Sequence, residues 1–194
     1  MNGEDSMTAN FKDLEKWSPE LNICIRCGYC YELCPLYKAH PWESDTPRAK
    51  MLLVYGLLTG DLEPSQHVAE KISECFFCKN CENNCSANVP VTDIIKEAKA
   101  ALAEAGYEVD RTASTVDEDL CCRCYTCVSV CKAEAVEPDE DGQPVVDPVE
   151  CEGCGVCAAS CPSGAISQKD GFGVSREELR QLLLDTLRKG AQVE

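Results

Sequence analysis

The stretch that decides the fold is Cys24-Ile25-Arg26-Cys27-Gly28-Tyr29-Cys30-Tyr31-Glu32-Leu33-Cys34, in which the cysteines follow the spacing C-x2-C-x2-C-x3-C. The same spacing occurs three more times along the 194 residues. The four runs are Cys24/Cys27/Cys30/Cys34, Cys75/Cys78/Cys81/Cys85, Cys121/Cys124/Cys127/Cys131 and Cys151/Cys154/Cys157/Cys161. They use all but one of the 17 cysteines, so the chain consists of one unit repeated in two tandem pairs.

This spacing favours cubane 4Fe-4S clusters. A chain that winds around a cubane can reach three iron corners with thiolates two residues apart, and the fourth thiolate must come from elsewhere. In two-cluster ferredoxins the last cysteine of each run binds the cluster of the partner run. We therefore predict four 4Fe-4S clusters with crossed ligand sets. The sets are Cys24, Cys27, Cys30 and Cys85 for cluster 1; Cys75, Cys78, Cys81 and Cys34 for cluster 2; Cys121, Cys124, Cys127 and Cys161 for cluster 3; and Cys151, Cys154, Cys157 and Cys131 for cluster 4.

Structural zinc and disulfides are the other common uses of dense cysteine, and both fit this pattern poorly. Zinc takes four tetrahedral ligands, typically from two C-x2-C knuckles, and has no use for a third cysteine two residues later in every run. Disulfides belong to oxidising compartments. An odd cysteine count and an acidic, polar N-terminus in place of a signal peptide predict a cytoplasmic protein.

The charge and hydropathy of the chain exclude two further classes. A formal net charge of -16 argues against binding to nucleic acid, whose phosphates require a basic face. The longest apolar stretch, Met51 to Leu58, is far shorter than the roughly 20 residues of a membrane helix, so no membrane insertion is expected. The acidity has two explanations: it either serves solubility alone or orients the docking of the chain to a basic patch on a partner.

The inserts between the runs predict a mainly α N-terminal half of the α-helical ferredoxin type. Helices are expected over 47–58, 64–73 and 93–105, where apolar residues recur at helical spacing or Ala-rich sequence ends at Gly106. The C-terminal half is expected to be α+β and bacterial ferredoxin-like, with a short hairpin around Asp141-Gly142. The predicted boundaries are 1–17 for an N-terminal extension, 18–106 and 119–170 for the two cluster domains, 107–118 for a linker, and 171–194 for a C-terminal amphipathic helix and tail.

Three further features of the sequence carry predictions. Cys122 breaks the spacing, which favours a buried inert thiol over an alternative ligand. Basic residues stand inside three of the runs, where they either favour the reduced cluster or are simply solvated; they are Arg26, Lys79 and Arg123. The apolar stripe of the helix over 175–189 either clamps a partner or packs on the C-terminal ferredoxin half; it consists of Leu179, Leu182, Leu183 and Leu187.

Each half also resembles a known family. The stretch 115–167, with D-L-C-C-R-C-Y-T-C-V-S-V-C and C-E-G-C-G-V-C-A-A-S-C-P-S-G-A-I, resembles a bacterial-type ferredoxin with two 4Fe-4S clusters. The stretch 18–106, with C-I-R-C-G-Y-C-Y-E-L-C-P and T-P-R-A-K-M-L-L-V-Y-G-L-L-T-G, resembles the helical ferredoxin of the heterodisulfide reductase C subunit. Ser86 and Lys132 stand where proline is common in these families. The second resemblance implies a relay between a flavin-containing or hydrogenase-type subunit and a catalytic subunit rich in Cys-Cys-Gly motifs.

The expected function is therefore electron transfer within a larger anaerobic oxidoreductase complex of the heterodisulfide-reductase-like type. No catalytic residue is predicted, because the chain lacks a G-x-G-x-x-G motif and a P-loop, and its one Cys-Cys pair is followed by Arg123. A free diffusible polyferredoxin is the main alternative. A self-contained reductase would need an open iron site, and sixteen cysteine ligands leave none.

Overall fold

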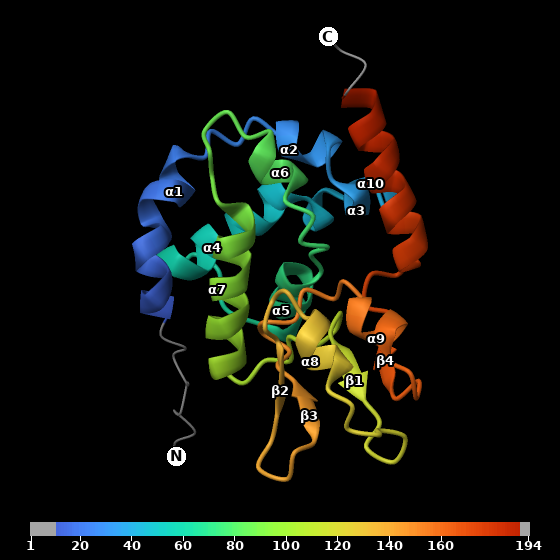
Figure 1. Cartoon of the computed structure of the whole chain (residues 1–194). Helices are drawn as coiled ribbons and strands as arrows, with labels where there is room; N and C mark the ends of the chain where they lie inside the picture. Colours follow the sequence, from blue (N-terminus) through green and yellow to red (C-terminus); the bar gives the residue numbers. More distant parts are fainter. Residues whose placement is uncertain (1–10, 191–194) are drawn as a thin grey trace, which may run out of the picture.

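The computed structural model describes residues 11–190 and confirms the predicted fold class. Figure 1 shows the helices of the N-terminal half gathered on one side and two small sheets in the C-terminal half below them. Most of the predicted N-terminal extension, residues 1–10, lies outside the described residues. In chain order, the N-terminal half contains η1 (Phe11–Trp17), α1 (Ser18–Ile23), α2 (Tyr29–Glu32), α3 (Pro35–Ala39), η2 (Glu43–Asp45), α4 (Pro47–Thr59), α5 (Gln66–Ser73), α6 (Asn80–Asn83) and α7 (Val91–Glu104).

The three long helices of this half lie where the sequence predicts them, within two or three residues. Helix α4 begins at Pro47 because Thr46 caps it, its hydroxyl accepting the Ala49 N-H at 3.1 Å. Helix α5 begins two residues later than predicted, because the Ser65 hydroxyl accepts the Val68 N-H at 3.3 Å and so fixes the cap.

These helices bury a continuous apolar core. Fully buried side chains of this core come from four elements and include Leu14, Val54, Ile72, Ile94 and Leu102. Leu14 belongs to η1, which packs on α4 and α7. Residues 11–17 are therefore part of the helical core, whereas the sequence placed them in an extension before residue 18.

The C-terminal half consists of two small two-stranded sheets, two short helices and the longer helix α10. Its elements are β1 (Ser114–Val116), α8 (Thr126–Val130), β2 (Val136–Pro138), β3 (Pro144–Val146), α9 (Val156–Ser160), β4 (Ile166–Gln168) and α10 (Arg176–Gly190). Strands β2 and β3 form the predicted hairpin, with Val136 opposite Val146. Strand β1 pairs with the distant β4, with Ser114 opposite Gln168, and this pairing closes the half.

The segment expected to be a linker, residues 107–118, differs from a free tether. Its middle is buried, with Thr112 and Ala113 at 0% and 3% exposure, and its end is strand β1. The Thr112 hydroxyl also donates to the Ser73 carbonyl of α5 at 3.5 Å. The polar composition of this segment suggested a solvent-exposed linker. Its polar groups are instead hydrogen-bonded through strand pairing and through contacts with the helical half.

Helix α10 is the predicted C-terminal helix, and its position answers a question that the sequence left open. Figure 1 shows it crossing back beside α3, on the N-terminal half. Leu179 is fully buried in a cluster with Cys34, Leu36 and Phe172, while Leu187 is 52% exposed. The start of the apolar stripe therefore packs on the helical half, which is neither of the two alternatives drawn from the sequence.

Among residues 11–190, no helix combines the length and the apolar character that a membrane crossing requires.

Candidate metal centres

All four cysteine runs have the same loop backbone. In each run the residues just before and just after the second cysteine have positive φ; the pairs are Arg26 and Gly28, Phe77 and Lys79, Arg123 and Tyr125, and Gly153 and Gly155. Backbone N-H groups in such left-handed turns form concave nests that bind anions, as they do at many iron-sulfur sites. Five of the eight positions are not glycine, although a left-handed conformation costs an ordinary residue about 1–2 kcal/mol. The loops are therefore held in this shape by their surroundings.

A short helix follows each loop and positions the third cysteine. Helices α2, α6, α8 and α9 each begin directly after the second left-handed residue. They carry Cys30, Cys81, Cys127 and Cys157 in their first turns. The fourth cysteine of each run then lies at or just past the end of its helix, where the chain turns away from its own loop toward the partner run.

Two cavities in the helical half gather the cysteines of the first two runs. One cavity, with about 390 Å³ of space between atoms, is lined by the predicted cluster 2 set, Cys34, Cys75, Cys78 and Cys81. The other, with about 510 Å³, is lined by the predicted cluster 1 set, Cys24, Cys27, Cys30 and Cys85, and also by Cys81. The structure thus brings each fourth cysteine to the cavity of the partner run.

The C-terminal half brings the predicted cluster 4 set together in the same crossed manner. A third cavity, with about 770 Å³ between atoms, is lined by the predicted cluster 4 set, Cys131, Cys151, Cys154 and Cys157. For the cluster 3 set, Cys127 lies close enough to Cys121 and Cys124 for their charges to interact. Cys161 packs in the same apolar cluster as Cys127.

The sulfurs surround a space and do not converge on a point. Within residues 11–190, no group of three or more His, Cys, Asp or Glu side chains is placed to hold a single metal ion. A tetrahedral zinc site needs such convergence. A cubane presents four separate iron corners, so its thiolates lie around it, as these cysteines lie around their cavities.

Burial dominates the thiol chemistry of the helical half. It raises the pKa of Cys75 to about 12 and that of Cys30 to about 11, and it also raises the pKa of Cys81. Neighbouring thiols add to the effect at Cys81, since Cys75, Cys78 and Cys34 all lie nearby. Iron binding removes these protons, so the sites favour a group that supplies strong positive charge to each sulfur.

Hydroxyl groups act in the opposite direction in parts of the C-terminal half. The Thr126 hydroxyl lies 3.4 Å from Cys124 Sγ and lowers the pKa of that thiol. The Ser163 hydroxyl, 3.5 Å from Cys161 Sγ, lowers the pKa of Cys161 in the same way. Hydrogen bonds to the thiolate favour the charged form, and hydrogen bonds to sulfur also tune cluster potentials.

Two buried lysines next to the cysteines are an unexpected feature. Lys50 is 2% exposed and lines the cluster 2 cavity, and Lys99 is fully buried. Within residues 11–190, neither ammonium lies within 4.0 Å of a carboxylate oxygen. Burial lowers the pKa of both, and nearby thiols oppose it, Cys75 and Cys34 at Lys50 and Cys151 and Cys75 at Lys99.

Unpaired buried cations are costly unless an anion faces them. A 4Fe-4S group held by four thiolates carries net negative charge, so it fits these surroundings. The nests, the cysteine-lined cavities and the buried ammonium groups all favour the binding of such an anionic group. When bound, such a group supplies reversible one-electron chemistry, and the chain supplies the sulfurs, the N-H groups and the charges around them.

One prediction about the loops is wrong, and two features of the sites were not predicted. Cys122 is exposed rather than buried, because it lies in an open loop beside Leu120, which is also exposed. The five left-handed non-glycine residues were not predicted, since neither composition nor spacing reveals positive φ. Lys50 and Lys99 had a signal that was overlooked. Each stands on the apolar side of its helix, Lys50 beside Met51 and Lys99 between Ile95 and Leu102.

Comparison with family models identifies both halves. Residues 23–90 match a model described as a 4Fe-4S dicluster domain, and residues 120–166 match a second model with the same description. The chain therefore contains two 4Fe-4S dicluster domains, one in each half.

Two of the similar curated proteins are named iron-sulfur subunits, and another is named a ferredoxin-type protein. The probable glycolate oxidase iron-sulfur subunit of Bacillus subtilis (strain 168) is 33% identical over 81 residues, which are 41% of this chain and 18% of that protein. The glycolate oxidase iron-sulfur subunit of Escherichia coli (strain K12) is 34% identical over 85 residues, 44% of this chain and 20% of that protein. This chain thus spans about a fifth of the length of those two relatives. The methylamine utilization ferredoxin-type protein MauM of Methylophilus methylotrophus is 30% identical over 160 residues, 74% of this chain and 62% of that protein.

Proposed function

We propose that this chain is an electron-transfer subunit that carries four 4Fe-4S clusters within a larger oxidoreductase complex and performs no catalysis of its own. One observation carries the proposal: four cysteine runs share a single left-handed loop backbone, and in three of the four candidate sets the fourth cysteine lines a cavity with the first three cysteines of its partner run. Crossed ligation of this kind holds two clusters close together in each half. Short distances between clusters suit the chain to carry electrons over its length.

The ligands proposed for each cluster are those predicted from the sequence. The cavities support three of the four sets directly, because each is lined by all four predicted cysteines. The cluster 3 set rests on the shared spacing and loop backbone and on the proximity of Cys127 to Cys121 and Cys124. The matches to two dicluster domains support a total of four clusters, two in each half.

The exposed surfaces around the cluster 1 loop and the cluster 3 loop differ in chemistry, which supports docking to two different partners. Around the cluster 1 loop the side chains are apolar and exposed, with Ile25 at 72% and Tyr29 at 64%. Around the cluster 3 loop they are acidic, and the exposed residues include Asp117, Glu118 and Asp119. An apolar face suits a permanent subunit contact, and an acidic face steers a transient basic partner.

The finer proposal is a complex of the heterodisulfide-reductase-like type. In it, the cluster 1 end would contact a catalytic subunit rich in Cys-Cys-Gly motifs, and the cluster 3 end would face a flavin-containing or hydrogenase-type donor. The support is the resemblance of residues 18–106 to a C-subunit ferredoxin. Two similar proteins are named iron-sulfur subunits of glycolate oxidase, a different oxidoreductase, so the identity of the co-purifying partner decides the type of complex.

A free polyferredoxin is the second candidate, favoured by the exposure of Cys122, Cys124 and Leu120 at the cluster 3 end. Anaerobic purification of the tagged chain from its native host separates the two. The subunit proposal predicts co-elution of at least one partner at a fixed ratio. It also predicts that Ile25→Glu releases a partner without loss of iron, whereas the control Leu187→Glu, at an exposed apolar residue of α10, does not. A lone iron-loaded monomer at micromolar concentration would replace this proposal with the free carrier.

A further inference from the structure

The buried lysines differ in how many cysteine runs they reach. Lys50, on α4, lines the cavity of the cluster 2 set and interacts electrostatically with Cys75 and Cys34. Lys99, on α7, interacts with Cys75 of the helical half and with Cys151 of the C-terminal half. Lys50 therefore serves one candidate cluster, and Lys99 lies between two candidate clusters that belong to different halves.

The contacts of Lys99 place its charge at this junction. Its ammonium donates to the Pro148 carbonyl at 3.0 Å and to the Cys151 carbonyl at 3.3 Å. The same nitrogen lies 5.6 Å from the centre of the Phe77 ring, inside the second run. One buried positive charge thus touches the second loop and the fourth loop.

Further contacts hold the two loops side by side. The Thr112 hydroxyl donates to the carbonyl of Ser73, two residues before Cys75. Arg176 then links the same segment to the fourth run, since it donates to the carbonyls of Thr112 at 2.9 Å and Gly153 at 2.7 Å. These contacts between the halves all involve the second and fourth runs or residues beside them, which are the runs of clusters 2 and 4.

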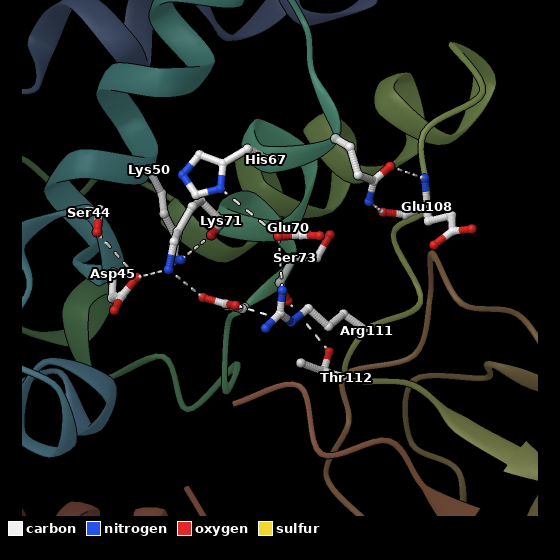
Figure 2. A network of polar contacts seen from close by, with 12 residues as sticks. Ser44, Asp45, Lys50, His67, Glu70, Lys71, Ser73, Glu108, Arg111 and Thr112 are labelled. Carbon is white, nitrogen blue, oxygen red and sulfur yellow. Dashed lines mark hydrogen bonds and ion pairs between the residues drawn. The ribbon is translucent and has the colours of Figure 1, made fainter. Parts of the chain in front are cut away.

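The acidic groups near this junction are bound to other cations, which leaves the charges of Lys50 and Lys99 without a carboxylate partner. Figure 2 shows Asp45 turned toward Lys71, at 2.7 Å, and Arg111 toward Glu70, at 2.9 Å. Glu74 is also held, by Lys71 at 3.1 Å. Lys50 donates to the backbone carbonyl of Lys71 instead.

A cation in this position has a definite effect on redox equilibrium. Reduction adds a negative charge to a cluster, so a buried positive charge nearby stabilises the reduced form and raises the potential. The effect is strong where water is excluded and weak at the surface. Arg48 near the first run is paired with Glu43, and Arg123 in the third run is exposed, so neither matches the buried lysines.

We propose that electrons cross between the two halves at clusters 2 and 4, and that Lys99 raises the potential of both while Lys50 raises that of cluster 2 alone. The resulting order along the chain is cluster 1, cluster 2, cluster 4 and cluster 3, with the most oxidising positions in the middle. Each crossing moves one electron and makes or breaks no bond. This inference rests on the proposed ligand sets.

The test is a redox titration of anaerobically purified full-length variants, followed by electron paramagnetic resonance. Lys99→Met should shift two of the four reduction waves to lower potential, and Lys50→Met should shift one. The shifted wave in Lys50→Met should be one of the two that shift in Lys99→Met. The expected size is on the order of tenfold in the reduction equilibrium constant, which equals about 59 mV for one electron.

Controls keep the test decisive. Lys16→Met removes an exposed lysine paired with Glu97, and it should move no wave. Lys99→Gln keeps a donor for the two carbonyls but removes the charge, so it covers the case in which Lys99→Met does not fold. Four unmoved waves in iron-loaded Lys99→Gln, or a single moved wave, would overturn the inference. Loss of iron and sulfide from the wild-type chain would instead overturn the proposed function.

Discussion

The second and third cysteine runs have the same spacing and the same pair of left-handed residues, yet their surroundings are opposite. In the second run Cys81 is buried, and Cys75 interacts with the buried ammonium groups of Lys50 and Lys99. In the third run Cys124 is exposed and is hydrogen-bonded to a hydroxyl. The comparison teaches that one spacing and one loop backbone can hold thiols of different chemistry, because the surroundings of each run determine that chemistry.

The largest expected difference concerns loss of one ligand from each run. Cys78→Ser should remove or convert cluster 2 and leave Lys50 facing an incomplete anionic site. Removing one partner of a buried charge interaction costs about 3–5 kcal/mol. Cys124→Ser should also disturb its cluster, because metal binding and folding are coupled in small metallodomains. It exposes no buried cation, so we expect it to destabilise the protein less.

Iron content and anaerobic thermal unfolding of the two variants measure this difference. The comparison predicts a lower unfolding temperature for Cys78→Ser than for Cys124→Ser, with iron lost from one cluster in each. Equal destabilisation would mean that the surroundings of the two loops matter less than their shared backbone.

Removal of α10 should affect the buried run and spare the exposed one. Truncation after Gly173 takes away Leu179, which packs on Cys34, and Thr186, whose hydroxyl accepts a hydrogen bond from Lys38 at 2.6 Å. Exposing the cluster 2 cavity should lower iron occupancy by about one cluster, or four iron atoms. Truncation after Arg188 keeps these contacts and serves as the control. Full iron content in the shorter chain would show that α10 does not protect this cavity.

In the iron-free protein, Cys75 of the second run should react with thiol reagents more slowly than Cys124 of the third run. The thiolate is the reactive form. The pKa of Cys75 lies near 12, against an ordinary value of 9.0, so at pH 8 its thiolate is on the order of 1,000-fold scarcer than that of an unperturbed thiol. Cys124, with its pKa lowered, should react first. Iodoacetamide labelling with peptide mass spectrometry gives each rate, and faster labelling of Cys75 than Cys124 would contradict the assignment.

The same pKa shift predicts how the stability of the iron-free helical half depends on pH. Between pH 9 and about 12 the unfolded chain loses the Cys75 proton while the folded chain keeps it. The folded state then binds more protons, so the free energy of unfolding falls as pH rises. Below pH 9 both states are protonated and the contribution is fully present. Chemical denaturation of the iron-free protein at pH 8 and pH 10 measures the loss.

The smallest expected effect is that of Cys122→Ser. Cys122 lies between the predicted ligands Cys121 and Cys124 but is exposed and outside the spacing, so its loss should leave the iron content unchanged and the stability within about 0.5 kcal/mol of the wild type. If Cys122→Ser instead behaves like Cys124→Ser, the ligand register of the third run is wrong.

Much of the fold followed from local signals in the sequence. Thr46 and Pro47 mark the start of α4, and Asp141-Gly142 marks the hairpin of β2 and β3, because caps and turns depend on residues next to them. The position of α10 against α3 could not be predicted in this way. An amphipathic stripe shows that a helix packs on something, and it does not show on what.

The candidate sites show the same contrast between local signals and tertiary packing. The grouping of sixteen cysteines into crossed sets was predicted from their spacing together with the crossed ligation of two-cluster ferredoxins. The buried state of Lys50 and Lys99 came from tertiary packing, which places charged side chains on the apolar faces of α4 and α7. The strand β1 within the expected linker depends on β4, about 50 residues further along, so local polarity misjudged it.

The central claim is that these cysteines hold four iron-sulfur clusters, and the most direct test is metal and sulfide analysis of the full chain purified without oxygen. The proposed function predicts about 16 iron atoms and a similar amount of acid-labile sulfide per chain, four of each for every cluster. Lower iron with sulfide present would call for the same measurement after reconstitution with iron and sulfide. About four zinc ions per chain and no sulfide would contradict the claim.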